Sequence, residues 1–121
     1  MTNNPIDYEK FLEEINHAEL YNGSHFSTYV EKVKIFIRNA EFEKAEFLLL
    51  RLIEATEAGD NLSHWGVAPW YYERLAILYK KQKRFDEEIE ILERFSNQRH
   101  APGVTPLILL KRLNNARKIL R

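Results

Sequence analysis

The chain contains no cysteine among its 121 residues. Disulfide bonds, thiolate catalysis and zinc sites built on cysteine are therefore excluded. Glycine and proline are scarce, with four of each, whereas a sandwich of many strands and turns would need more of both. Apolar runs such as residues 47–50 and 107–110 are far too short to span a bilayer, and the amino terminus lacks the pattern of a signal peptide. We therefore expect a soluble, cytoplasmic protein with no membrane partner.

The chain also lacks a net charge, because 18 basic residues balance 18 acidic ones. A protein whose main task is wrapping nucleic acid needs a basic excess to neutralise phosphates. The charge is nevertheless unevenly distributed, since the charged residues among 1–22 are acidic except for Lys10 and no acidic residue follows Glu93. This gradient is consistent with head-to-tail contacts, with a site for an anionic partner, or with an unselected surface.

Apolar residues recur at spacings of three and four along most of the chain, which is typical of amphipathic helices. Asn4-Pro5 and Thr105-Pro106 are helix-start signals, while Asn22-Gly23 and Gly59-Asp60-Asn61 are typical of helix ends. The sequence predicts no strand and an all-α fold of about six helices. Their expected ranges are 5–21, from between 24 and 28 to 39, 41–58, 69–82, 85–97 and 105–120.

Residues 26–59 and 69–102 form two similar units, with residue 69 matching residue 26 at an offset of 43. The first helix of the second unit carries Tyr72, Leu75-Ala76 and Tyr79, and its second helix carries apolar residues from Phe85 to Phe95. The equivalent places in the first unit are taken by Tyr29, Val33, Phe36, Phe42, Ala45, Leu49 and Leu52. This order of large, small and aromatic residues resembles the tetratricopeptide repeat, in which small residues let paired helices cross closely.

The resemblance implies a single domain over residues 1–121, built as a short right-handed α-α superhelix of antiparallel helix pairs. Helices 5–21 and 105–120 would then cap the two repeat-like units. Three features depart from the family pattern. Lys32 stands where the first unit should have leucine, Glu88 replaces the usual small residue of the second unit, and the loop 60–68 lengthens the usual period of about 34 residues.

No motif indicates catalysis, a cofactor or a metal. The four histidines are not paired at ligand spacing on one helix, and no zinc-protease motif, phosphate loop or nucleophile elbow is present. We interpret His64-Trp65 as a loop anchor that packs Trp65 over a helix end, and Asp86-Glu87-Glu88 as charges that complement a helix dipole. The sequence therefore predicts that the protein is not an enzyme.

The resemblance also implies a concave groove lined by the first helix of each unit. Basic side chains over an apolar floor suit a partner peptide or helix with acidic and hydrophobic residues, so we predict a protein–protein interaction module that acts as adaptor or regulator. The simpler interpretation is that the basic residues are solubilising and that Trp70 packs into the preceding pair. The expected groove residues are Val30, Lys34, Ile37, Arg38, Trp70, Glu73, Ile77, Lys80 and Lys81.

Two alternatives from other classes stay open. The basic run at residues 80–84, together with the C-terminal helix, is consistent with a nucleic-acid-associated accessory protein. The leucine stripe of the last helix, Leu109, Leu113, Ala116 and Leu120, is consistent with pairing to a second copy in a homodimer or with burial as a cap within the chain.

Overall fold

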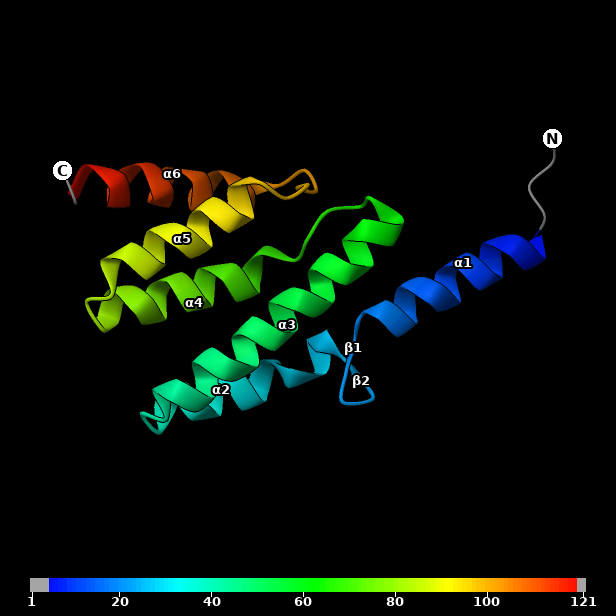
Figure 1. The fold of residues 1–121 in the computed structure, drawn as a ribbon, viewed down its shortest axis with the longest axis horizontal. Coiled ribbons are helices and arrows are strands. Elements are labelled where there is room, and N and C mark those ends of the chain that lie inside the picture. The colour runs from blue at the N-terminus through cyan, green and yellow to red at the C-terminus, as the bar shows by residue number, and fades with distance from the viewer. Residues whose placement is uncertain (1–4, 120–121) are drawn as a thin grey trace.

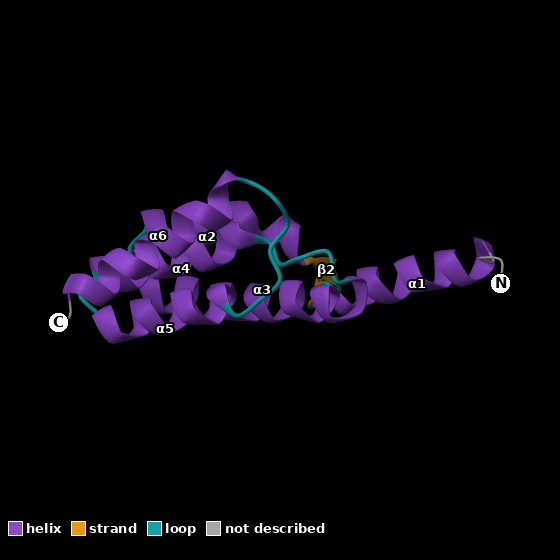
Figure 2. Ribbon diagram, turned by 90° about the horizontal axis from the view of Figure 1, so that it is seen from above, coloured by secondary structure: helices purple, strands orange, loops and turns teal. Residues whose placement is uncertain are grey.

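The computed structural model describes residues 5–119, and this part of the chain is almost entirely helical (Figures 1 and 2). The prediction of an all-α fold with six main helices is confirmed, and none of the described helices is both long and apolar enough to cross a membrane. The elements are α1 (Pro5–Ala18), β1 (Leu20–Tyr21), β2 (Ser24–His25), a 3-10 helix (Phe26–Tyr29), α2 (Val30–Arg38), α3 (Phe42–Ser63), α4 (Pro69–Lys81), α5 (Phe85–Ser96) and α6 (Val104–Ile119).

The helices pack in an order that follows the chain. α2 packs against α3, α3 against α4, and α4 against α5. α6 covers α5 and part of α4, and α1 packs on α3. α1 and the end of α6 therefore lie at opposite ends of the long axis (Figure 1). The stripe of α6 is buried within the chain at Leu109, Leu113 and Ala116, as expected of a cap, and Leu120 lies outside the described residues.

The turns α2–α3 and α4–α5 have the same backbone geometry at the 43-residue offset. Ala40 and Lys83 occupy equivalent places in left-handed conformation, with φ of 57° and 59°. Each turn closes with a backbone bond back to the preceding helix, at 2.8 Å from Glu41 N to Phe36 O and at 2.9 Å from Arg84 N to Tyr79 O. This is the Schellman pattern of helix C-termini. The two helix pairs thus share their turn geometry, whereas the repeat family and the superhelical twist stay predictions.

The expectation that the first helix reaches residue 21 is wrong. α1 ends at Ala18, and a two-stranded antiparallel hairpin follows it, pairing Leu20 with His25 and Tyr21 with Ser24. Asn22 and Gly23 form its turn with φ of 48° and 83°, because two positive φ angles match the twist of a tight hairpin. The pair therefore reverses a short strand and does not cap a helix.

The expected end of the third helix at residue 58 is also wrong, since α3 continues to Ser63. Gly59 is buried inside the helix, where an added Cβ would lie 2.5 Å from the side chain of Glu19. The glycine thus permits a close approach of the segment that follows α1, and it does not stop the helix. His64, with φ of 60°, ends α3 by donating its N–H to the carbonyl of Asp60 at 2.8 Å.

The loop between α3 and α4 is held by buried polar groups of α3. The Asp60 carboxylate accepts the Gly66 N–H at 2.8 Å and the Arg99 guanidinium at 3.2 Å. Trp65 itself stays 57% exposed and meets the ring of Phe11, in the middle of α1, edge to face at 6.4 Å. The predicted packing of Trp65 over a helix end is therefore wrong, and Asp60 is the anchor of this loop.

Candidate functional site

The nine residues predicted to line a concave groove are distributed along the α2 and α4 surfaces. Val30, Ile37 and Trp70 are half-buried and pack against the core, which agrees with the simpler interpretation of Trp70. Glu73 and Ile77 are also half-buried, whereas Lys34, Arg38, Lys80 and Lys81 are exposed. Lys34 pairs with Glu31 at 3.6 Å, and Lys80 lines a cavity beside α6.

The basic run 80–84 is only partly engaged in contacts within the chain, since Lys80, Lys81 and Lys83 are exposed. Lys81 places its Nζ 5.2 Å from the centre of the Phe42 ring. The Arg84 guanidinium binds Glu46, with Nη1 2.6 Å from Oε1, and also Glu87, whose carboxyl pKa it lowers by hydrogen bonding. Arg84 is therefore ion-paired, while the three exposed lysines of this turn stay available to an anionic partner, and the nucleic-acid hypothesis stays open.

A second surface forms a hollow of about 370 Å³ between the hairpin, α2 and α3, and we call it the aromatic groove. Four aromatic rings contribute to its wall, together with two lysines at its rim. The groove is lined by Tyr21, Asn22, Tyr29, Lys32, Phe36, Glu43, Lys44, Phe47 and Leu48.

Local structure explains why these rings meet. The hairpin turns the chain back so that the Tyr29 hydroxyl donates to the Tyr21 carbonyl at 2.5 Å, with the two rings edge to face at 5.5 Å. Phe36 lies two turns after Tyr29, on the same side of α2. Phe47 and Leu48 extend from the facing side of α3, and Leu48 is buried. The hairpin therefore closes one end of a groove whose walls are two antiparallel helices.

Phe47 is 58% exposed, although phenylalanine is usually buried. The Arg51 guanidinium lies 5.3 Å from the centre of this ring, and the Nζ atoms of Lys32 and Lys44 lie 5.9 Å and 6.0 Å from the centre of Phe36. The groove thus combines exposed aromatic surface with a mainly positive rim, since Glu43 is its one acidic lining residue. Such a surface can bind apolar side chains flanked by carboxylates.

Sequence reasoning assigned Tyr29 and Phe36 to the repeat core and did not select Phe47. One signal was available. The run Phe47-Leu48-Leu49-Leu50 covers more than one face of a helix, so part of it had to point away from the core. The hairpin, which places Tyr21 beside Tyr29, could not be read from two-residue strands.

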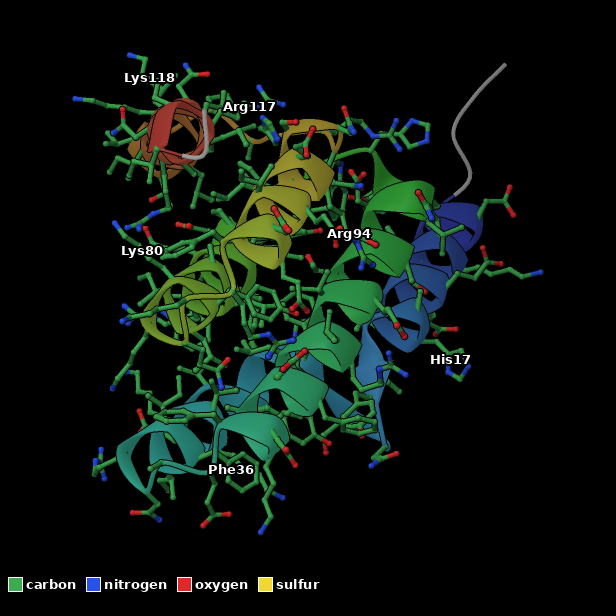
Figure 3. All side chains as sticks on the ribbon, turned by 60° about the vertical axis from the view of Figure 1, so that its left-hand side comes forward. His17, Phe36, Lys80, Arg94, Arg117 and Lys118 are labelled. Atoms are coloured by element: carbon green, nitrogen blue, oxygen red, sulfur yellow. The ribbon has the colours of Figure 1, made fainter. Side chains whose placement is uncertain are left out.

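Two tyrosines donate hydrogen bonds to glutamates that are paired with arginines, and these contacts join α3, α4 and α5. The Tyr72 hydroxyl donates to Glu57 at 2.7 Å, and Arg94 binds the same carboxylate with both Nε (2.8 Å) and Nη2 (2.7 Å). Tyr79, Glu46 and Arg84 repeat this arrangement nearer the other end of the helices. Figure 3 shows Arg94 between α5 and α3. We therefore assign these groups to positioning of the helices.

Burial and the neighbouring carboxylates raise the pKa of both Tyr72 and Tyr79. Burial alone raises the pKa of Tyr71 to about 12. These phenols therefore stay neutral at physiological pH and act as hydrogen-bond donors. Within residues 5–119 no group of three or more His, Cys, Asp or Glu side chains could hold a metal ion.

No protein-family model, curated protein or solved structure matches this chain.

Proposed function

We propose that the chain is a non-enzymatic protein-interaction module, an adaptor or regulator of the tetratricopeptide-repeat type, that binds an amphipathic helix of a partner protein in the aromatic groove. The observation that carries this proposal is the exposed ring of Phe47 beside Phe36 and two lysines. Exposed aromatic anchors surrounded by charge are typical of docking sites and are uncommon on surfaces that only face water.

The shape of the groove favours a helix as the occupant. Its walls are the antiparallel helices α2 and α3, and in this fold the side of such a pair accepts a further helix, as α4 and α5 accept α6. A docked helix would present large apolar residues at positions i, i+3 or i+4, and i+7 to the four rings. Acidic residues beside this stripe would face Lys32 and Lys44.

A selection from a displayed library of helical peptides tests the proposal. The wild-type protein should enrich sequences with that apolar spacing and flanking Asp or Glu, and Phe47→Ser should lose the enrichment. Ile35→Ser is the matched control, because Ile35 is also a large apolar residue, 45% exposed, on α2 and does not line the groove. Equal enrichment by the wild type and Phe47→Ser would refute the site. Turnover of a substrate by the purified protein would refute the non-enzymatic role.

The groove predicted from the repeat resemblance, on α2 and α4, can be compared in the same selection. A Lys34→Glu/Lys81→Glu variant reverses two exposed charges of that surface and leaves the aromatic groove intact. If this variant lost the enriched helices while Phe47→Ser kept them, the partner would bind on α2 and α4. Retention by the charge variant and loss by Phe47→Ser would favour the aromatic groove.

A further inference from the structure

Residues 45 and 88 occupy equivalent positions in the two helix pairs but carry very different side chains. Each N–H continues the helix from the same turn, at 3.1 Å from Ala45 to Glu41 and at 3.0 Å from Glu88 to Arg84. Ala45 is 0% exposed and gives close helix packing, whereas Glu88 is 3% exposed and places a carboxylate in the equivalent spot. The second pair therefore buries a charge where the first pair buries a methyl group.

The dipole interpretation of Asp86-Glu87-Glu88 holds for the first two residues and fails for the third. Asp86 is exposed and Glu87 pairs with Arg84, but Glu88 is buried. Its carboxylate has no hydrogen-bond partner among residues 5–119, and burial raises its pKa although the charges of Lys80 and Arg112 act to lower it. The carboxylate oxygens reach the cavity that the Glu88 side chain lines, whereas the fully buried polar atom without a partner in this region is Nε of Arg112. A partly desolvated carboxylate without a hydrogen bond is favoured by a ligand that donates to it.

The Glu88 side chain lines a cavity of about 260 Å³ between α4, α5 and α6. Lys80 extends from α4 into the space that faces α6 (Figure 3), and Arg112 of α6 has a buried Nε without a partner. The cavity thus contains one carboxylate and three basic groups, with apolar wall segments between them. It is lined by Lys80, Phe85, Glu88, Ile108, Lys111, Arg112, Asn115, Ala116 and Ile119.

The charges restrict the class of ligand. The three basic groups Lys80, Lys111 and Arg112 attract an anion and repel a simple cation, whereas Glu88 is left without a partner when a simple anion binds. A zwitterion satisfies both sets, because its ammonium can donate to Glu88 while its carboxylate accepts from the basic groups. The volume corresponds to roughly nine water molecules, which is the size range of an amino acid.

We propose that the cavity between α4, α5 and α6 binds a free α-amino acid. The ammonium group pairs with Glu88, the carboxylate pairs with Arg112, Lys111 and Lys80, and an apolar side chain packs against Phe85 and Ile108. This site does not depend on the proposed docking function, since no residue lines both the cavity and the aromatic groove. It also brings together two basic segments that are far apart in the sequence.

The test is a titration of the isotopically labelled protein with single amino acids up to about 10 mM, followed by backbone amide shifts. Apolar amino acids should shift the amides of residues 80, 85–88 and 108–116 with saturation. Acetate and methylammonium each carry one half of the zwitterion and should bind at least about tenfold more weakly. Nucleoside monophosphates are included because they also combine an anionic group with hydrogen-bond donors.

Glu88→Gln should weaken amino-acid binding by at least about tenfold, because the neutral amide cannot pair with an ammonium group. Glu90→Gln is the matched control on α5, since Glu90 is exposed and does not line this cavity, and it should bind as the wild type does. Saturable shifts that are lost only in Glu88→Gln would support the proposal. It would be overturned by the absence of shifts, by unchanged binding in Glu88→Gln, or by tighter binding of nucleoside monophosphates or acetate.

Discussion

Replacing Glu88 with glutamine should stabilise the protein at neutral pH. The residue is 3% exposed, its carboxyl group faces the cavity without a hydrogen bond to residues 5–119, and desolvation raises its pKa in the folded state. The folded protein consequently binds this proton more tightly than the unfolded chain, whose glutamate pKa is about 4.3. The protonated group is therefore favourable for folding at low pH, and that advantage is lost as the pH rises through the folded pKa. At about pH 7 the ionised carboxylate opposes folding.

The expected size follows from the surroundings of the carboxylate. A buried polar group without a partner destabilises a protein by about 1–3 kcal/mol. Lys80 and Arg112 offset part of this, because their charges attract the carboxylate. Glutamine has nearly the same shape and is also polar, so the substitution removes only the penalty for burying the charge, and we expect Glu88→Gln to gain ~1 kcal/mol. For a chain of this length the corresponding rise in Tm is about 4 °C.

Urea unfolding followed by circular dichroism, at about pH 7 and about pH 4, measures this effect. The gain of Glu88→Gln should be largest at the higher pH and should shrink towards the lower one, where the wild-type carboxylate becomes protonated. Glu90→Gln, an exposed change on the same helix, should alter stability little at either pH. Lower stability of Glu88→Gln at neutral pH, or a gain that ignores pH, would show that the carboxylate is already well paired.

Three further changes test other parts of the fold by the same unfolding measurement. Glu57→Gln should cost about 2–3 kcal/mol because it leaves the Arg94 guanidinium without its bidentate partner, and a loss below ~0.5 kcal/mol would contradict that role. Lys83→Gly should gain ~0.5–1 kcal/mol, since Lys83 has φ of 59°, and a loss would contradict the strain. Gly66→Ala should lose about 2–3 kcal/mol, because φ is 102° and its Cβ would lie 2.5 Å from the Ala101 nitrogen; unchanged stability would show that the loop adjusts freely.

The sequence predicts helices best where local signals and packing agree. α4 and α5 begin at the expected residues 69 and 85, because Pro69 and the Phe85 stripe mark their starts directly. Two predicted helix ends were wrong: α1 ends before residue 21, and α3 continues beyond residue 58. Asn22-Gly23 was read as a helix end but forms a hairpin turn, and Gly59 was read as a stop but serves a close contact with Glu19. In each case the residue type correctly indicates an unusual backbone position. Whether that position is a hairpin turn, a helix end or a close contact depends on residues elsewhere in the chain, which the spacing of apolar residues does not reveal.

The candidate sites were harder to predict because they depend on contacts between distant segments. Lys80 belongs to the basic run 80–84, and Lys111 and Arg112 belong to the C-terminal helix, yet only the packing of α6 on α4 and α5 places them around Glu88. The departure of Glu88 from the repeat pattern was visible in the sequence, whereas its lack of a hydrogen-bonding partner was not. The equivalence of Glu88 with the buried Ala45 is thus the one feature of the sequence that pointed to the proposed cavity.

The position of the tyrosine–glutamate–arginine contacts separates the two proposed sites mechanically. Glu46 and Glu57 are eleven residues apart on α3, about 16 Å along the helix, and each ties α3 to both α4 and α5. The helices α3, α4 and α5 are thus held together. The aromatic groove lies on the α3 side of this group, and the cavity lies where α6 packs on α4 and α5. α6 has no such contact with α3, and its ion pair with α5, Arg117 to Glu93 at 3.1 Å, is exposed. An amino acid in the cavity would therefore contact α4, α5 and α6 without touching the aromatic groove, with which the cavity shares no lining residue.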